Sequence, residues 1–405
     1  MLGIIIIVLL TILIALLVYQ TNKKLAIIFI IGVSLRYLLC FLQEYYSLLP
    51  YVWDEEVFYT MSVRMKEYFL NYRQTLPFES LVSSVSSYGM FGGIILAYLS
   101  DLPVILRLVN GFIGGLIILS VYRFSILMGL KENYSNYISM LIAFTPSYII
   151  FSSLIMRDMI VWLLIILAVM FMVKSLKYNS MSNFIYSLLI SLLLIPFRKQ
   201  YVPILAIILM FFLLLFINKY KITIKNIELL GIKKIVILVV FAISSISIFY
   251  LVQNEISSWG KDLFLDYFNS QLGWRQQGGA SYLSNMTYTS ISDIIMYSPI
   301  RFIYFTFGPF LGSSTSPFIL LTALEALVGT ISFIYIMINL GIIKNLSQNS
   351  KYNLIFIIFF AIIGLSLNAI IDSNFGTAIR HRMVYMQFIF IASLYLYQTR
   401  KYETS

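Results

Sequence analysis

Residues 2–18 read LGIIIIVLLTILIALLV and residues 25–41 read LAIIFIIGVSLRYLLCF. Apolar runs of this length are long enough to cross the hydrocarbon core of a bilayer. Lipid offers no hydrogen-bond partners, so such runs are expected to be helices. Nine further runs of the same kind follow, at 104–128, 137–154, 159–173, 184–196, 202–217, 235–252, 317–343, 354–371 and 383–397. The sequence therefore predicts an all-α polytopic membrane helix bundle of about 11 spans.

The overall composition supports this class. Of 405 residues, 60% are hydrophobic and 11% are charged, against about a quarter charged in ordinary soluble domains. This balance excludes a soluble globular enzyme and a disordered chain. The single cysteine, Cys40, excludes an intrachain disulfide, and the single histidine, His381, excludes a histidine-cluster metal site.

The loop charges predict the topology. If the eleven runs span, and the shorter stretches 82–99 and 300–311 stay on one face, one side carries 15 Lys and Arg against 3 acids. That side is expected to be cytoplasmic, with the first run retained as a span and the amino terminus outside. The opposite side carries 12 basic residues and 13 acids. Topology thus accounts for the net charge of +11, and no nucleic acid partner is expected.

The domain prediction is one membrane-embedded unit, residues 1–405, with long outer loops at 42–103 and 253–316. We expect interfacial helices in both loops. For a bacterial chain, this places the protein in the plasma (inner) membrane with its active face outside. Arg36 lies within a span, so we expect it to contact a partner side chain inside the bundle, for which Glu325 is a candidate.

The two sides also differ in residue type. The predicted cytoplasmic side has 13 lysines and 2 arginines, whereas the outer side has 9 arginines and 3 lysines. Topology requires only positive charge, but a guanidinium can also bind phosphate or carboxylate through two parallel hydrogen bonds. Outer arginines next to span ends therefore indicate an anionic ligand. Ion pairs with the outer acids, or snorkelling to the interface, are the structural alternatives.

Carboxylates form a second pattern on the outer side. The first outer loop contains Trp53-Asp54-Glu55-Glu56, in which neighbouring side chains point in different directions if the segment is helical. Asp158 follows Arg157 in a tight corner between two spans. A solvated acidic loop is the alternative interpretation for the first cluster. These acids also leave a divalent cation open as a cofactor, with its ligands unknown.

Several corners carry the outer basic residues. They are Arg198-Lys199 after Pro196, Arg275 before a Gly-Gly pair, Arg301 in Ser-Pro-Ile-Arg, and Arg380-His381-Arg382 at the start of the last run. Three basic side chains at an outer span end run against the positive-inside tendency. An anionic ligand would explain them.

The order of these elements resembles a known group. The Asp54-Glu55…Tyr59 element, the Leu106–Gly111 segment (LRLVNG) and the Pro146…Ser152…Arg157-Asp158 corner resemble the amino-terminal module of GT-C superclass membrane glycosyltransferases. The carboxyl half, with its Gly-Pro-Phe and Asn-x-Gly-Thr-Ala-x-Arg-His-Arg elements, is similar to multispan capsule and O-antigen assembly proteins. Those are taken to be glycosyltransferases or repeat-unit polymerases.

The resemblance implies a reaction and a set of residues. The donor is a polyprenyl phosphate- or diphosphate-linked sugar or oligosaccharide, and other polysaccharide-assembly proteins are expected partners. Asp54 matches the first-loop general base or metal ligand, with Glu55 next, and Asp158 matches the second acid. The substrate-binding candidates are Arg157, Arg198, Lys199, Arg275, Arg301, Arg380, His381 and Arg382. Single-sugar transfer and polymerisation both stay open.

Two other classes of function compete with a glycosyltransferase. A lipid-linked oligosaccharide flippase would carry charges along its spans and show pseudo-repeat halves. This chain places only Arg36 and Glu325 within spans, and no repeat is seen. A non-catalytic scaffold would not require nine outer arginines.

Overall fold

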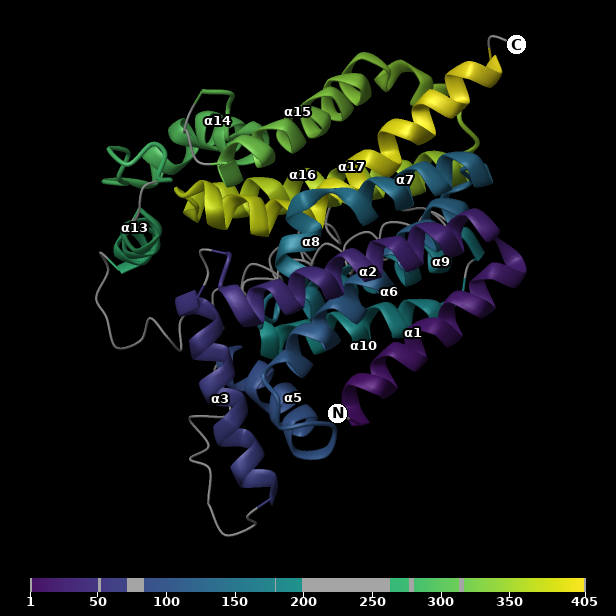
Figure 1. Ribbon diagram of the computed structural model, residues 1–405. Coiled ribbons are helices and arrows are strands. Elements are labelled where there is room, and N and C mark those ends of the chain that lie inside the picture. The colour runs from purple at the N-terminus through teal and green to yellow at the C-terminus, as the bar shows by residue number, and fades with distance from the viewer. Residues whose placement is uncertain are drawn as a thin grey trace, which may run out of the picture. The chain divides into compact units, whose positions relative to one another are not determined.

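A computed structural model describes residues 2–49, 52–70, 84–178, 180–198, 263–276, 280–312 and 317–403 (Figure 1). Within these ranges almost all residues are helical, and the β pairing is limited to an isolated bridge between Ser281 and Asn374. Six described helices are long and apolar enough to cross a membrane. They are α1 (Leu2–Thr21), α2 (Lys23–Tyr46), α6 (Val104–Met128), α9 (Asp158–Tyr178), α15 (Pro317–Ile338) and α16 (Gln348–Ile371). The prediction of an all-α polytopic membrane bundle is confirmed.

The remaining described elements are shorter or carry more charge. They are α3 (Val52–Leu70), α5 (Ser84–Tyr98), α7 (Glu132–Phe144), α8 (Pro146–Ser152), α10 (Met181–Phe197), α13 (Leu263–Arg275), α14 (Ile291–Phe307), the 3-10 helix η2 (Leu340–Asn345) and α17 (Phe375–Glu403). Helix α5 covers most of 82–99 and α14 contains residues 300–307 of 300–311, the two stretches predicted to stay on one face. With 15 and 17 residues, both are shorter than the about 20 residues that a span needs. The predicted spans 202–217 and 235–252 lie outside the described residues.

One predicted span is interrupted in the structure, so the prediction of a continuous span there is wrong. Residues 137–154 form no single helix, because α7 ends at Phe144 and α8 begins at Pro146. Proline has no backbone N–H, and it forces the residue before it out of the helical conformation. Thr145 accordingly has an extended backbone, with φ −64° and ψ 121°.

The chain separates into two compact units. The first unit comprises Met1–Leu167 with Leu192–Gln200, and the second comprises Ala168–Ser191 with Tyr201–Ser405. Whether they act as the single predicted unit stays a prediction, and each is described by itself below.

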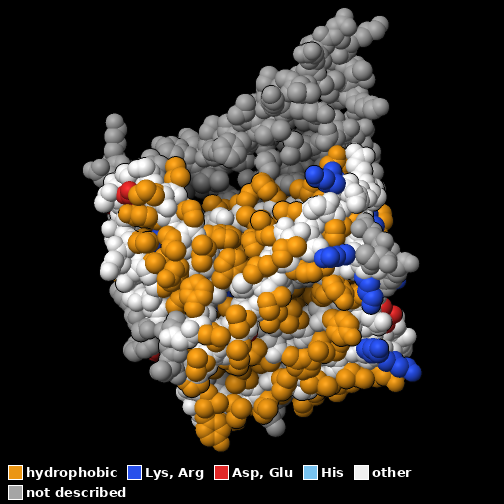
Figure 2. Space-filling view, turned by 90° about the horizontal axis from the view of Figure 1, so that it is seen from above, with side chains coloured by type: hydrophobic (Ala, Val, Ile, Leu, Met, Phe, Trp, Pro, Cys, Tyr) orange, Lys and Arg blue, Asp and Glu red, His pale blue; other side chains and the backbone are white. Residues whose placement is uncertain are grey.

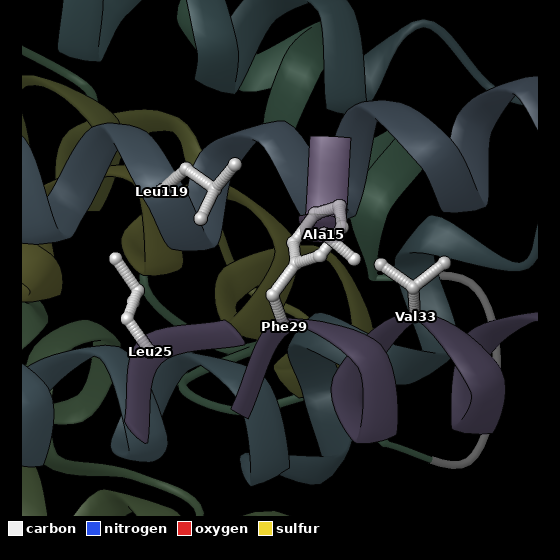
Figure 3. Packing of buried hydrophobic residues seen from close by; sticks show 5 residues of the cluster. All are labelled: Ala15, Leu25, Phe29, Val33 and Leu119. Carbon is white, nitrogen blue, oxygen red and sulfur yellow. The ribbon is translucent and has the colours of Figure 1, made fainter. Parts of the chain in front are cut away.

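The core of the first unit lies where α1, α2 and α6 pack together. Asn22 ends the turn between α1 and α2 and caps α2 by accepting a hydrogen bond from the Leu25 N–H at 2.9 Å. Figure 3 shows the apolar cluster that these helices share: Ala15, Leu25, Phe29, Val33 and Leu119. At Gly115 the helices approach so closely that a Cβ atom would lie 2.4 Å from Val33 Cγ2. The absence of a side chain there permits α2 to pack on α6.

The surface is as apolar as a lipid-facing surface requires. Hydrophobic side chains cover most of the described surface in Figure 2, and charged ones are sparse. On α1, Leu9, Leu13 and Leu16 each leave more than half of their area exposed. An exposed apolar face of this extent would be unfavourable in water but suits a hydrocarbon environment.

In the second unit, α17 packs against both α15 and α16, and α14 packs against α16. Helix α14 begins with a capping box, in which the Ser290 hydroxyl and the Asp293 carboxylate each accept from the other's backbone N–H. Helix α16 ends at Ile371 and α17 begins at Phe375, so residues 372–374 form a tight corner. This corner is the centre of the second candidate site.

Candidate functional site

The first turn of α3 separates the two leading acidic candidates. Asp54 and Glu55 are consecutive, so a helix turns their side chains about 100° apart. Asp54 is exposed, whereas Glu55 is only 4% exposed. The predicted difference in direction is confirmed.

Glu55 joins three parts of the first unit. Its carboxylate forms an ion pair with Arg107 on α6, accepts from Gln43 Nε2 at 2.9 Å, and accepts from the backbone N–H of Ile155 at 2.7 Å. Arg107 also contacts Glu44 through its Nε atom at 3.0 Å. Glu55 therefore anchors α3 to the ends of α2 and α6 and to the corner that precedes α9.

The corner before α9 holds the next candidates. Asn110 of α6 donates from Nδ2 to the carbonyls of Leu154 at 2.6 Å and Met156 at 3.0 Å, which fixes the backbone between α8 and α9. Asp158 then begins α9, and its Oδ1 atom lies 2.5 Å from Arg198 Nη2; both side chains are 3% exposed. A buried pair of this kind is costly to desolvate unless both charges are matched.

Arg157 completes this group. Its guanidinium carbon lies 5.4 Å from the ring centroid of Phe58, one turn along α3 from Glu55. The structure thus brings together Glu55, Arg157, Asp158 and Arg198, with Asp54 exposed on the same turn as Glu55. Lys199 lies outside the described residues.

The opposite ends of the same helices are chemically different. Asn22, at the start of α2, donates from Nδ2 to the Tyr122 hydroxyl at 2.9 Å and to Asn136 Oδ1 at 3.1 Å. The basic residues of this end are Lys23, Lys24, Arg123 and Lys131. Lysines therefore mark the start of α2, while Glu44 lies at its end, where Glu55 pairs with Arg107 of α6. Which end faces the outside stays a prediction from the charge rule.

Asp372 is the centre of the second unit's site. It is fully buried at the corner between α16 and α17. Its Oδ2 atom lies 2.7 Å from His381 Nδ1 and 3.6 Å from Arg275 Nη1, while Thr377 donates its hydroxyl hydrogen to Oδ1. Burial opposes ionisation, but Arg275, His381 and the Thr377 hydrogen bond outweigh it and hold the pKa of Asp372 below its usual value.

Arginines and a tyrosine in this unit bind carbonyls at helix ends. Arg275 Nη1 donates to Ile371 O at 3.1 Å, and the Tyr288 hydroxyl donates to Ile370 O at 2.7 Å, both at the end of α16. Arg382 donates to the carbonyls of Phe305, Thr306 and Gly308 at the end of α14. The last carbonyls of a helix have no intrahelical partner. These side chains supply the missing donors.

Arg301 links the same corner to the segment before α14. Its Nη2 atom donates to Met286 O at 2.5 Å and its Nη1 atom donates to Asp372 O at 3.5 Å. Its guanidinium carbon lies 5.1 Å from the ring centroid of Tyr288. Backbone hydrogen bonds from Tyr282 N to Ser373 O and from Phe375 N to Ala280 O attach this segment to the corner.

Three sequence candidates contact this corner, namely Arg275, Arg301 and His381. The fourth, Arg382, contacts the end of α14 instead. Arg380 lies on the same turn of α17 and is half-buried. Sequence reasoning missed Asp372 and Tyr282, although Asp372 is an acid at the end of a predicted span beside a basic run. In the first unit it also left out Arg107 as the partner of Glu55.

The buried carboxylates in the described ranges, Glu55, Asp158 and Asp372, each contact a cation. No group of three or more His, Cys, Asp or Glu side chains gathers there as metal ligands. Glu55 and Asp158 each contact an arginine, and Asp372 contacts Arg275 and His381. The sequence left a divalent cation open as a cofactor, but the described residues contain no set of ligands for it.

Comparison with known proteins yields one solved structure to report. No protein-family model matches the chain, and no curated protein matches it. The chain is similar to the crystal structure of the Archaeoglobus fulgidus oligosaccharyltransferase in the apo form, at 13% identity and a TM-score of 0.46. The similarity covers 96% of this chain and 52% of that one, so the chain spans about half the length of that enzyme.

Proposed function

We propose that this membrane protein is a glycosyltransferase that uses a polyprenyl phosphate- or diphosphate-linked sugar on the outer membrane face, in cell-surface polysaccharide assembly. The observation that carries the proposal is the anchoring of Glu55 to Arg107 and to the Ile155 N–H. These contacts hold the first turn of α3, on which Asp54 is exposed, beside the Arg157-Asp158 corner.

The chemistry of the two sites suits this reaction. Glycosyl transfer needs a base near the acceptor hydroxyl, and an exposed carboxylate on a fixed helical turn can serve as one. It also needs cations where charge develops on the leaving phosphate. In the first unit, Asp54 is the candidate base, and Arg157 lies at the neighbouring corner. In the second unit, considered by itself, Arg275, Arg301 and Arg382 are the candidate cations.

The charge inside a span favours this reading over a flippase. Arg36 of α2 donates to Gly32 O at 2.8 Å, Ala143 O at 3.0 Å and Ile142 O at 3.1 Å. The i+4 residue of Ile142 is Pro146, which has no N–H to offer. Arg36 therefore compensates for the break after α7, and its partners are carbonyls rather than the acid Glu325 that the sequence offered. Its position in a span needs no transported substrate to explain it.

Substitution of Asp54 tests the proposal. Asp54→Asn should abolish transfer of labelled sugar from a polyprenyl-linked donor in membranes, while expression and thermal unfolding stay unchanged. Glu56→Gln is the matched control, because Glu56 is also exposed on the same turn of α3, and it should retain activity. Full activity of Asp54→Asn would refute the assignment of the base.

Cysteine labelling tests the predicted side. In a Cys40→Ala background, Glu56→Cys should react with a membrane-impermeant maleimide in intact cells, and Lys131→Cys only after permeabilisation. Both positions are exposed. The reverse labelling pattern would place the acidic site in the cytoplasm and exclude the proposed donor face.

A further inference from the structure

Two buried donors near Asp372 have no acceptor among the described residues. Among the described residues, Tyr282 Oη and Arg301 Nε have no hydrogen-bond partner. Tyr282 is 4% exposed and Arg301 is fully buried. A buried polar group that lacks a partner costs about 1–3 kcal/mol, so such groups in a native fold call for an explanation.

The two donors belong to one neighbourhood. The Tyr282 ring packs against Phe375 at 4.7 Å and stacks on Tyr304 at 5.8 Å between ring centroids. The charges that act on its phenol oxygen are those of Asp372, Arg301, Arg275 and Arg382. The Tyr282 backbone N–H donates to Ser373 O, and Arg301 donates to the adjacent Asp372 O, so both residues lie at the corner between α16 and α17.

The carboxylate of this corner does not satisfy the Tyr282 hydroxyl. Asp372 Oδ1 accepts from Thr377, and Oδ2 faces His381 and Arg275. Arg275, Arg301 and Arg382 lie around Tyr282, and the described carboxylates that act on them are Asp372 and Glu325. Positive charge is therefore still in excess, and burial strengthens the preference for a balancing negative charge. A ligand that suits two donors beside surplus positive charge is an oxyanion.

We infer that Tyr282 and Arg301 bind a phosphoryl group, with the Tyr282 hydroxyl and the Arg301 Nε–H donating to its oxygens and Arg275 and Arg382 supplying positive charge. The inference rests on the proposed function where it takes this group to be the phosphate of the lipid-linked donor. It adds Tyr282 as a phosphate-binding residue, which the sequence analysis did not identify. Asp372 then acts as a positioning residue, because it holds Arg275 and His381 in place.

The test uses a substitution that removes one atom. Tyr282→Phe keeps the ring that packs on Phe375 and Tyr304 and deletes the hydroxyl. Since that hydroxyl has no acceptor within the described chain, the variant should unfold at the wild-type temperature or slightly above it. Tyr304→Phe is the matched control, because it deletes a hydroxyl from the neighbouring ring of the same stack.

Binding is measured on the full-length protein in nanodiscs with three probes: a polyprenyl phosphate, the neutral polyprenol and inorganic phosphate. We expect Tyr282→Phe to weaken polyprenyl phosphate binding about tenfold, as loss of a hydrogen bond to a charged group predicts. Tyr304→Phe should bind like the wild type, and polyprenol binding should be the same in all three proteins. Arg301→Lys, which keeps the charge but loses the Nε–H, should resemble Tyr282→Phe.

The probes distinguish the source of the phosphoryl group. If inorganic phosphate shows the same dependence on Tyr282, the site recognises the phosphoryl group by itself; if only the lipid phosphate does, the carrier chain is needed as well. Both results support the inference. Equal binding by Tyr282→Phe and wild type, equal losses in Tyr282→Phe and Tyr304→Phe, no binding by the wild type, or failure of Tyr282→Phe to fold would each overturn it.

These outcomes are separate from those for Asp54. Loss of phosphate binding in Tyr282→Phe in a protein without transfer activity would keep the site and refute the glycosyltransferase. Transfer activity that needs Asp54 but not Tyr282 would keep the enzyme and refute the site.

Discussion

His381, the protein's sole histidine, places its Nδ1 atom 2.7 Å from the Oδ2 atom of Asp372. Both side chains are buried, and the two residues are nine positions apart in the chain. The contact fixes the start of α17 on the corner that ends α16. A carboxylate that contacts one ring nitrogen orients the imidazole.

Stability should depend on the charge of Asp372. Because its folded-state pKa lies below the ordinary value, the stabilisation is present above the unfolded pKa of about 3.9 and is lost as pH falls through the folded value. Asp372→Asn should therefore cost about 3–5 kcal/mol at neutral pH, as breakage of a buried ion pair predicts. The difference should shrink as pH falls below about 4.

Thermal unfolding of the purified protein across this pH range checks the prediction. Asp266→Asn is the control, because Asp266 is exposed on α13 of the same unit. A loss of stability in Asp372→Asn that stays constant with pH would show that shape, not charge, makes Asp372 important.

The buried pair Asp158–Arg198 should behave differently from a partly exposed pair. Asp158→Leu or Arg198→Met alone leaves a buried charge and should cost about 3–5 kcal/mol, whereas the double variant should cost much less than their sum. The pair Lys66–Asp101, at 2.7 Å with Lys66 half-buried and Asp101 exposed, is the control and should show a coupling of at most about 1 kcal/mol. A double-mutant cycle by thermal unfolding measures both; additive effects at Asp158 and Arg198 would contradict the ion pair.

The same double variant separates structure from chemistry. A stable Asp158→Leu/Arg198→Met protein without transfer activity would give this pair a direct part in the reaction. A stable and active one would limit the pair to holding the corner before α9.

The sequence predicts the elements of the first site better than the contacts of the second. Apolar runs predict most of the helices, although not the break at Pro146, and helical geometry separates Asp54 from Glu55. The partners of Asp372 are not accessible in this way, because Arg275 lies 97 residues earlier and only the packing of α13 on α16 brings it near. Likewise, no charge pattern marks backbone carbonyls, so the acceptors of Arg36 on α7 were missed.

Arg36 should be essential for stability because it replaces backbone donors that Pro146 removes. Arg36→Met keeps much of the volume but leaves the carbonyls of Ile142 and Ala143 without a donor, at an expected cost of about 2–4 kcal/mol. Arg123→Met is the control, since Arg123 is exposed on α6, and should change stability by less than about 0.5 kcal/mol. Thermal unfolding in detergent compares the three proteins, and wild-type stability of Arg36→Met would show that the α7 end needs no donor.

The approach of α16 to α17 should depend on the missing side chain at Gly364. A Cβ atom there would lie 1.9 Å from Tyr385 Cε1, and Tyr385 is itself buried between the helices. Gly364→Ala should therefore force the ring or the helices apart, at a cost of about 1–3 kcal/mol. At Gly341 a Cβ atom would meet nothing within 4 Å, so Gly341→Ala should be neutral or slightly stabilising by restricting the unfolded chain. Thermal unfolding of both variants measures the two effects. Equal changes in stability would mean that backbone entropy, rather than the contact with Tyr385, explains why glycine occupies position 364.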